Sequence, residues 1–579
     1  MLVHKFVDGD KPIMVLLHGV LTPWQVWQPQ IDSFKKQYNI FVIALNAHTE
    51  ETASEFISVL DEAKEIINVN YNSIYTGDGV NVGIIDEGYP NNTLNFTNNE
   101  IVDYNTLRSS EHTNKVASII GGTYGIATNS NLYIHSYSSS NSDYNFDDGI
   151  EWLLGKGVNV VNISMYSDGR TGNQGEYDGH SAYLDYIVWN NYLTIVKSAG
   201  NRGRTDDFVT NPGVGMHTIS VGSIDGNKNI SDYSSWDVDS SIDGILMKPT
   251  LVAPGENIII PNTNNSILDS TGTALENDYS GTSFAAPMVT GTIALLMEEF
   301  PILMQYPGAY MSALIAGASK LPSQTSVWDT YAGAGLINYE TTREILKSYS
   351  YVNTSITNST STSTSVISKV VSIDANKEID YCLFLVQNSN VTTPSSTVYT
   401  PNISKYQVKI YNENNELIEA TEYGENSNLI IGTITNTSTT TKVYNIEVYL
   451  INKKTSDIEY LSLSYNHIHS YTMQYYNYKW HKLTCECGQT TGSTQVHTIL
   501  QSEIANGRYA ECLGCHHLLD LNSDMALVRG INSASVTKVS INGSYILPSG
   551  IVVLVDEDLD AYLNGTLVFY DKDKVPVLQ

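Results

Sequence analysis

The hydrophobic pattern changes its character along the chain. In the first part, apolar residues form runs of strand length, such as Ile13–Leu17 and Val80–Ile85. Such runs are typical of strands that a parallel sheet buries on both faces. From about residue 368, apolar and polar residues alternate, with turns rich in Asn, Gly and Thr between the runs. This alternation, rich in Tyr, Val and Ile, predicts an antiparallel β-sandwich over residues 368–464.

The N-terminal segment has its own order of elements. The strand Ile13–Leu17 leads into His18-Gly19, a helix is expected over residues 26–37, and Phe41–Leu45 reads as a second strand. Over residues 5–67 this order resembles the start of the α/β-hydrolase fold. That chemistry needs a Gly-x-Ser-x-Gly elbow, which occurs nowhere in the 579 residues. We therefore interpret His18-Gly19 as a structural remnant, and an esterase or lipase through this segment as the weakest functional hypothesis.

Composition excludes several classes of partner. Lys and Arg number 31 against 61 Asp and Glu, which gives a net charge of -30 and argues against nucleic acid and anionic membranes. No apolar run approaches the ~20 residues of a membrane span. Asp8, Asp10 and His18 interrupt the apolar stretch that a signal peptide would need, so we expect no signal peptide in the chain as given.

Three residues beyond the N-terminal segment suit a serine hydrolase. Asp86 stands at the carboxyl end of Val80–Ile85, the edge at which parallel sheets place ligands. His112 precedes a short apolar helix, and Ser283 stands at an expected helix start, where the dipole favours a serine oxygen losing its proton. We expect Pro287 in the first turn of that helix, since proline has no N–H to donate. Taken singly, each of the three also fits a structural role, for example an N-cap serine.

The order and context of these residues carry more information. Asp86, His112 and Ser283 follow each other at intervals of 26 and 171 residues, with the serine in Gly-Thr-Ser-x-Ala-x-Pro. Asn201 directly follows Gly200 in "IVKSAGNRG", residues 195–203, at the end of an expected strand. This pattern resembles the subtilisin-like serine proteases, or subtilases, which share this chain order. The resemblance covers about residues 70–345, with smaller echoes in the stretches 157–165, 217–225 and 251–258.

The resemblance implies a three-layer α/β catalytic domain and a role for each residue. Ser283 is the expected nucleophile, His112 the general base and then acid, and Asp86 the residue that orients His112. Asn201 and the backbone N–H of Ser283 are the expected oxyanion donors. Losing one such donor costs about 10²–10³ in turnover, a magnitude measured in subtilisin.

The family pattern also implies the surroundings of the site. Ser164 and the residues Ser198, Ala199 and Gly200 are expected to line a cleft that binds a polypeptide substrate by extended-strand pairing. Catalysis of this type needs no cofactor, and the resemblance implies structural calcium. It also implies an extracellular or cell-envelope location.

Two departures from the family pattern concern the same site. The glycines that usually follow the catalytic histidine are replaced by Thr113 and Ser118, which puts close backbone approach beside His112 in question. Glu87 follows Asp86, and a carboxylate that pointed inward would raise the pKa of His112. We expect Glu87 to face solvent. A catalytically inactive binding protein therefore stays open as an alternative to a serine endopeptidase.

A Cys- and His-rich stretch follows the predicted sandwich. Its cysteines form two tight pairs, Cys485-x-Cys487 and Cys512-x-x-Cys515. Two interpretations stay open: a tetrahedral site for structural Zn²⁺, or two disulfides. The short paired spacings favour the metal. Nearby histidines are His467, His469, His481, His497, His516 and His517.

These observations predict the domain organisation. Residues 349–367 are rich in Ser and Thr without an apolar period, so we expect a linker there. The C-terminal β modules are expected to bind a surface or another protein, with strands over Ser540–Val555. The predicted parts are an N-terminal segment 1–69, a catalytic domain 70–348, the linker, the sandwich 368–464, a Cys/His module 465–520 and a β-rich segment 521–579.

Overall fold

A computed structural model describes most of the chain between residues 63 and 466. Beyond that range it describes the strands and short segments 3–6, 13–18, 39–44, 471–475, 480–485, 490–500, 509–512, 516–520, 526–529, 545–546 and 552–553. Within that range the described residues are 63–69, 75–90, 96, 101–103, 109–123, 125–137, 146–165, 175–203, 208–237, 246–258, 279–395, 397–422 and 427–466. The chain forms two compact units, residues 1–369 with 373–467, and residues 370–372 with 468–579. Each unit is described by itself.

The centre of the first unit is a parallel sheet. Its strands are β4 (Asn81–Asp86), β5 (Ile101–Asp103), β6 (Asn131–Ser136), β7 (Val160–Ile163), β8 (Thr194–Ser198), β9 (Thr218–Ile224) and β10 (Leu251–Pro254). They lie in the order β10-β9-β8-β7-β4-β6-β5, and every pairing between neighbours is parallel. β7, β8, β9 and β10 are buried along their whole length, as continuous apolar runs predict.

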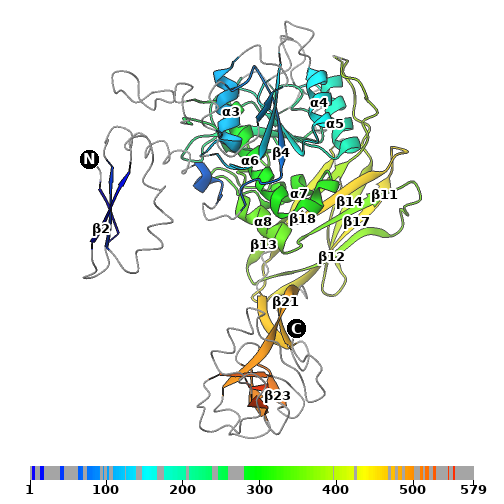
Figure 1. Ribbon diagram of the computed structural model, residues 1–579. Helices are drawn as coiled ribbons and strands as arrows, with labels where there is room; N and C mark the ends of the chain where they lie inside the picture. The colour runs from blue at the N-terminus through cyan, green and yellow to red at the C-terminus, as the bar shows by residue number, and fades with distance from the viewer. Residues whose placement is uncertain are drawn as a thin grey trace. The chain divides into compact units, whose positions relative to one another are not determined.

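Helices cover both faces of this sheet (Figure 1). They are α3 (Glu111–Gly121), α4 (Phe146–Gly155), α5 (Gly179–Asn191), α6 (Thr282–Glu299), α7 (Ala309–Gly317) and α8 (Tyr339–Lys347). α3 lies between β5 and β6 in the chain, α4 connects β6 to β7, and α5 connects β7 to β8. Figure 1 shows α3 on one side of the sheet and α4 and α5 on the other. α6 packs against α3, which confirms the predicted three-layer α/β class.

Helix α6 begins at Thr282, so Ser283 lies at its start as predicted, but Pro287 lies deeper in the helix than predicted. Pro287 lies inside the helix, five residues after its first residue Thr282, and not in the first turn. A proline there cannot donate to the carbonyl four residues back, which belongs to Ser283. The hydroxyl of Ser164 donates to that carbonyl instead, at 2.9 Å. A side chain from another element therefore takes the place of the missing helical hydrogen bond, which sequence alone does not show.

The β-sandwich consists of two antiparallel four-stranded sheets, in the orders β11-β18-β13-β16 and β12-β17-β14-β15. The strands are β11 (Tyr351–Ile356), β12 (Ser365–Ile373), β13 (Lys377–Val386), β14 (Lys405–Asn412), β15 (Leu417–Glu422), β16 (Leu429–Asn436), β17 (Lys442–Asn452) and β18 (Glu459–Tyr465). β11 and the start of β12 lie within the stretch expected to be a linker. β11 pairs with β18, from Tyr351 opposite Ser464 to Ile356 opposite Glu459. Threonine suits strands, and this partner lies about a hundred residues away, so no local pattern reveals it.

The sandwich and the parallel-sheet domain share one apolar core. α7 packs against β13 and β18, and the side chains of Cys382, Phe384 and Val386 belong to the same buried cluster as those of α7. At the same contact the hydroxyls of Ser312 and Ser464 lie 2.8 Å apart. The sandwich and the parallel-sheet domain therefore form one body. A sandwich attached only through a flexible linker would not share a core with the domain.

The described elements outside this body are short strands. At the N-terminus β1 (Val3–Phe6), β2 (Ile13–His18) and β3 (Asn39–Ala44) form a sheet in the order β1-β3-β2, with β2 and β3 parallel. The helix expected over residues 26–37 and the turn at Gly19 lie outside the described residues. The second unit contains β19 (Tyr471–Tyr475), β20 (Trp480–Cys485), β21 (Thr490–Leu500), β22 (Tyr509–Glu511), β23 (Leu518–Asp520), β24 (Ala526–Arg529), β25 (Tyr545–Ile546) and β26 (Val552–Val553).

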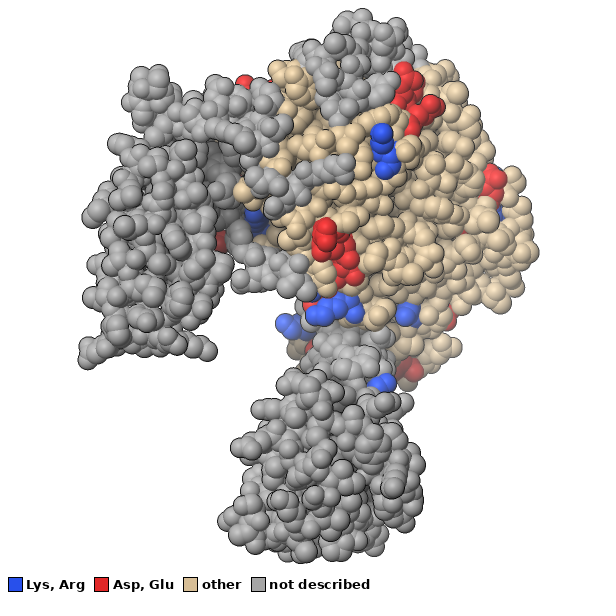
Figure 2. Space-filling model, in the orientation of Figure 1, with Lys and Arg blue, Asp and Glu red and all other residues tan. Residues whose placement is uncertain are grey.

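Two surface properties bear on partners. On the face in Figure 2, Asp and Glu lie in several separate groups among uncharged residues and not in one patch. Among the described residues, no helix has both the length and the apolar character needed to cross a membrane.

Candidate active site

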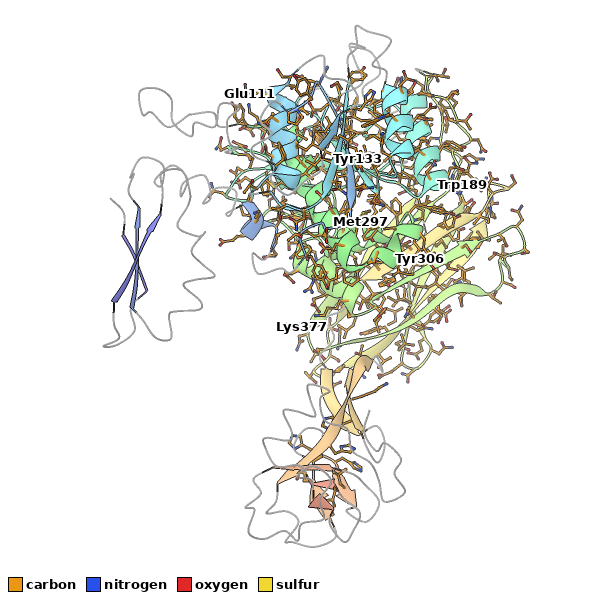
Figure 3. All side chains as sticks on the ribbon, in the orientation of Figure 1. Glu111, Tyr133, Trp189, Met297, Tyr306 and Lys377 are labelled. Carbon is orange, nitrogen blue, oxygen red and sulfur yellow. The ribbon has the colours of Figure 1, made fainter. Side chains whose placement is uncertain are left out.

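The predicted catalytic residues meet at the carboxyl edge of the parallel sheet. Asp86 is the last residue of β4, Ser164 directly follows β7, and Asn201 lies just beyond the end of β8. These three strands are neighbours in the sheet, so their carboxyl ends place the side chains together. His112 lies in the first turn of α3, next to Glu111, which Figure 3 labels, and Ser283 is the second residue of α6.

Asp86 and His112 form a hydrogen-bonded pair. The two atoms involved, Nδ1 of His112 and Oδ1 of Asp86, lie 2.8 Å apart. The Asp86 side chain is fully buried, whereas that of His112 is 28% exposed, so the imidazole is oriented from inside and reachable from outside. The backbone N–H of Glu87 also donates to Asp86 Oδ1, at 2.7 Å. This arrangement fixes the carboxylate before any substrate arrives.

Thr113 contributes to the hydrogen bonds around Asp86, although its replacement of a glycine in the family pattern put close backbone approach beside His112 in question. Its hydroxyl donates to Asp86 Oδ1 at 3.1 Å and accepts from the backbone N–H of Gly88 at 3.1 Å. The side chain thus links α3 to the turn after β4. Ser118, the other replaced glycine, donates to the carbonyl of Asn114 within its own helix. Both side chains are buried and accommodated.

The electrostatic surroundings raise the pKa of His112. Burial of the ring lowers its pKa, but the charge of Asp86 and its hydrogen bond act in the opposite direction and prevail. Glu87 adds to the increase through its charge. The side chain of Glu87 is exposed, as predicted, so its carboxylate acts on His112 at a distance and through solvent.

Ser283 and Ser164 form a reciprocal pair of hydrogen bonds. The hydroxyl of Ser283 donates to the carbonyl of Ser164 at 3.0 Å, and the hydroxyl of Ser164 donates to the carbonyl of Ser283 at 2.9 Å. A hydroxyl has one proton, so in this arrangement Ser283 does not donate to His112. The next residue, Phe284, places its ring centroid 5.6 Å from that of His112. The start of α6 therefore adjoins the Asp86–His112 pair.

Thr282 orients the Asn201 amide, a role that sequence reasoning missed. The backbone N–H and the hydroxyl of Thr282 both donate to Asn201 Oδ1, each at 2.8 Å. With its oxygen held by these two donors, the amide directs its nitrogen elsewhere. A Cβ added at Gly281 would lie 3.2 Å from that nitrogen, so the glycine leaves room beside it. The sequence clue to this role was the position of Thr282, which directly precedes Ser283 in the Gly-Thr-Ser motif.

The expected cleft residues lie beside the site, but not all can pair with a substrate strand. The N–H of Ala199 donates to Val221, and that of Gly200 to the Thr282 hydroxyl. Both N–H groups are thus used inside the protein, so these residues and Ser198 can form a wall but not a backbone ladder. Gly200 has φ +117, and an added Cβ would lie 2.6 Å from Thr210 Cγ2. A side chain at this position would be strained and crowded.

One of the four predicted thiol ligands in the second unit has a described side chain. Cys512 is buried, but the side chains of Cys485, Cys487 and Cys515 lie outside the described residues. The structure brings Cys512 together with His481 and His497. The sequence placed both histidines near the predicted thiols. It did not show that their side chains lie on the same face, because that depends on how β20 and β21 pair.

The geometry defines an α/β domain with a candidate active site at the carboxyl edge of its sheet, and comparison with known proteins shows what this domain is similar to. Residues 57–335 match the model of the subtilase family, which confirms the resemblance over this part of the chain and supports a serine peptidase. Subtilisin DY of Bacillus licheniformis is 28% identical over 287 residues, which cover 46% of this chain and 91% of that protein. Serine protease AprX of Bacillus subtilis (strain 168) is 25% identical over 338 residues, or 52% of this chain and 74% of that protein.

Among solved structures, the prenylagaramide maturation protease PagA matches with a TM-score of 0.39 and 24% sequence identity. The match covers 49% of this chain and 98% of that one.

Proposed function

We propose that the chain is a serine endopeptidase whose catalytic groups are Asp86, His112 and Ser283. The observation that carries this proposal is the 2.8 Å bond between buried Asp86 and partly exposed His112, next to the start of α6. A carboxylate that holds one imidazole nitrogen leaves the other free to act as a base. The subtilase match of the same residues supports this assignment.

The proposal assigns a group to each step of the reaction. Ser283 Oγ forms a bond to the substrate carbonyl carbon, and His112 Nε2 takes the hydroxyl proton. Asp86 stabilises the imidazolium through Nδ1–H. The carbonyl oxygen becomes an oxyanion, to which the Asn201 amide and the Ser283 N–H donate. When the C–N bond breaks, His112 gives the proton to the leaving amine, and the acyl group stays on Ser283 as an ester. A water molecule then attacks this ester with His112 again as the base, which releases the acid and restores the Ser283 hydroxyl.

The pairing of Ser283 with Ser164 defines a resting state. To transfer its proton to His112, Ser283 must turn about its Cα–Cβ bond and release the Ser164 carbonyl. Catalytic hydrogen bonds are often formed only with substrate in place, so this orientation is compatible with catalysis. The freed Ser164 carbonyl would then accept a hydrogen bond from the substrate backbone, which is the role we propose for this residue in place of pairing along Ser198–Gly200.

The test is labelling of the purified chain with a fluorophosphonate probe, followed by peptide mass spectrometry. We expect one adduct on Ser283 that disappears in His112→Ala, because the probe needs a serine activated by its base. His217→Ala is the matched control, since that histidine is buried away from the serine, and its adduct should persist while the chain stays folded. No adduct on a folded chain would overturn the proposal and favour an inactive binding protein.

The remaining roles are proposals of the same kind. We propose a polypeptide substrate, an extracellular or cell-envelope location, and binding of a surface or protein by the C-terminal β modules. Catalysis by subtilases needs no cofactor. Structural calcium stays a prediction that rests on the family resemblance.

A further inference from the structure

Three potential metal ligands meet inside the second unit. His481 lies in β20, His497 lies in β21, and Cys512 directly follows β22. One ligand atom from each lies within 4.8 Å of the other two. All three side chains are buried, with exposed fractions of 3%, 0% and 0%. The residues come from separate strands, so the fold and not the sequence spacing creates this cluster.

Strand pairing explains why the two histidines face each other. β20 and β21 are antiparallel, and His481 lies opposite Gln495. His497 is two residues beyond Gln495 on β21. Because side chains on a strand alternate between faces, His497 points to the same face as His481 and is its diagonal neighbour. The ring centroids lie 5.3 Å apart and the rings are perpendicular, which allows both to direct a nitrogen to one point.

The distances fit a tetrahedral metal. Cys512 Sγ and His481 Nδ1 lie 3.4 Å apart. Zinc bonds of ~2.3 Å to sulfur and ~2.0–2.1 Å to nitrogen, at tetrahedral angles, separate the two ligand atoms by ~3.6 Å. A metal ion therefore fits between these atoms with only a few tenths of an ångström of movement.

The burial pattern supplies an independent reason for a metal. Beyond residue 467, the described side chains that are buried are His481, His497, Cys512 and Leu519. Three of these four buried side chains carry a potential metal ligand. Small modules commonly use a metal or disulfides to hold their strands together.

We propose that His481, His497 and Cys512 bind a structural Zn²⁺ ion. The ion would join β20, β21 and the segment after β22. The proposal is independent of the protease function. It shares Cys512 with the four-cysteine set predicted from sequence and adds two histidines. By sequence spacing alone, Cys515 stands where the second thiolate of a Cys-x-x-Cys pair stands in zinc sites.

The surroundings of the Cys512 sulfur favour a metal over a disulfide. This sulfur lies 3.4 Å from Nδ1 of His481. Imidazole nitrogen and thiolate sulfur are ligands that zinc prefers. A disulfide would instead need a second sulfur at ~2.05 Å.

The experiment measures metal in the full-length chain, purified under reducing conditions. We expect about one zinc per chain by elemental mass spectrometry, in line with a single site. After exchange with Co²⁺, the chain should show thiolate-to-cobalt charge-transfer absorption. The variants Cys512→Ser, His481→Asn and His497→Asn should each reduce bound zinc at least tenfold after dialysis against a weak chelator. Cys512→His should keep zinc but lose the charge-transfer contribution of this sulfur, which covers the case that Cys512→Ser does not fold.

Two matched controls separate the cluster from other residues of the same types. His516→Asn changes an exposed histidine of the same module that pairs with Glu511, and Cys382→Ala changes a buried thiol in β13. Both should keep the zinc content and the cobalt spectrum of the unchanged chain. The proposal is overturned if the reduced chain binds neither metal, if zinc survives loss of all three residues, or if peptide mapping finds Cys512 in a disulfide.

Discussion

Two Asp–His pairs in the same domain have opposite properties. In the Asp86–His112 pair the histidine is partly exposed, and its Nδ1 lies 2.8 Å from the carboxylate. In the Asp185–His217 pair both side chains are fully buried. His217 Nδ1 lies 3.1 Å from the backbone carbonyl of Asp185 and 3.6 Å from its carboxylate.

The partners of the second pair indicate a structural role. The Asp185 carboxylate accepts from the backbone N–H groups of Met216 and His217 and from the Tyr177 hydroxyl. His217 Nε2 accepts a hydrogen bond from the backbone N–H of Gln387, with 3.3 Å between the two nitrogens. Gln387 belongs to the segment after β13, so this histidine fastens the sandwich to the parallel-sheet domain.

The pKa values of the two histidines shift in opposite directions. Burial lowers the pKa of His217, and the nearby charge of Asp185 does not compensate. Burial also acts on His112, but there Asp86 prevails and the pKa rises. The same two residue types therefore yield a base suited to proton transfer at His112 and an uncharged structural histidine at His217. Exposure and the direct imidazole–carboxylate bond make the difference.

The largest expected effect separates the pairs by activity. Asp86→Asn should lower kcat/KM for a quenched fluorescent peptide by about 10⁴, since an amide holds His112 in the wrong tautomer. Asp185→Asn should keep kcat/KM within about threefold at temperatures where it stays folded, because Asp185 contacts no reacting group. Similar losses of kcat/KM in both variants would contradict the assignment of one pair to catalysis and the other to structure.

The next effect reverses the comparison and concerns stability. Asp185→Asn should lower the free energy of unfolding by about 2–4 kcal/mol, because an amide cannot accept all three hydrogen bonds as a buried carboxylate does. Asp86→Asn should change it less. Chemical unfolding in a Ser283→Ala background, which prevents self-digestion, measures both. A greater loss for Asp86→Asn would contradict a structural assignment of Asp185.

The pH dependence of stability tests the lowered pKa of His217. Unfolded histidine takes up a proton as pH falls through about 6.5, whereas folded His217 resists it, so stability should fall as pH drops below that value. His135, whose pKa burial lowers to about 4, contributes in the same direction. His217→Gln should therefore show a shallower loss of melting temperature between pH 7.5 and 5, and an unchanged slope would refute the idea.

A smaller effect tests Thr113 as a positioning residue. Thr113→Val removes the hydroxyl that joins Asp86 to Gly88 and should lower kcat by about 5- to 30-fold, which corresponds to ~1–2 kcal/mol for lost hydrogen bonds. KM should stay nearly constant, and Thr113→Ser should restore kcat. If Thr113→Ser stays as slow as Thr113→Val, the hydroxyl is not the cause.

The smallest effect concerns Glu87. Because its charge raises the pKa of His112, Glu87→Gln should move the acid limb of the kcat/KM profile to lower pH. The movement should be small and should shrink at high salt, since Glu87 is exposed. Glu111→Gln is the control, as Glu111 is not among the groups acting on His112. A shift to higher pH would contradict the assigned sign.

Much of the fold and of the candidate site follows from local sequence. A continuous apolar run predicted the buried strand β4, and alternation predicted the sandwich strands, because side-chain burial repeats along each element. Asp86, His112, Asn201 and Ser283 were found from motifs at strand ends and helix starts, where short stretches of chain determine the backbone.

Other features depend on residues that are distant along the chain. The sequence by itself determined which residue types stand at the carboxyl edge of the sheet. Only the tertiary structure decided that Ser164 replaces the hydrogen bond lost at Pro287, that Thr113 binds Asp86, that β11 pairs with β18, and that His481 and His497 meet Cys512. Each of these contacts joins separate elements, so its geometry depends on how strands and helices pack, and no local pattern of residues encodes that packing.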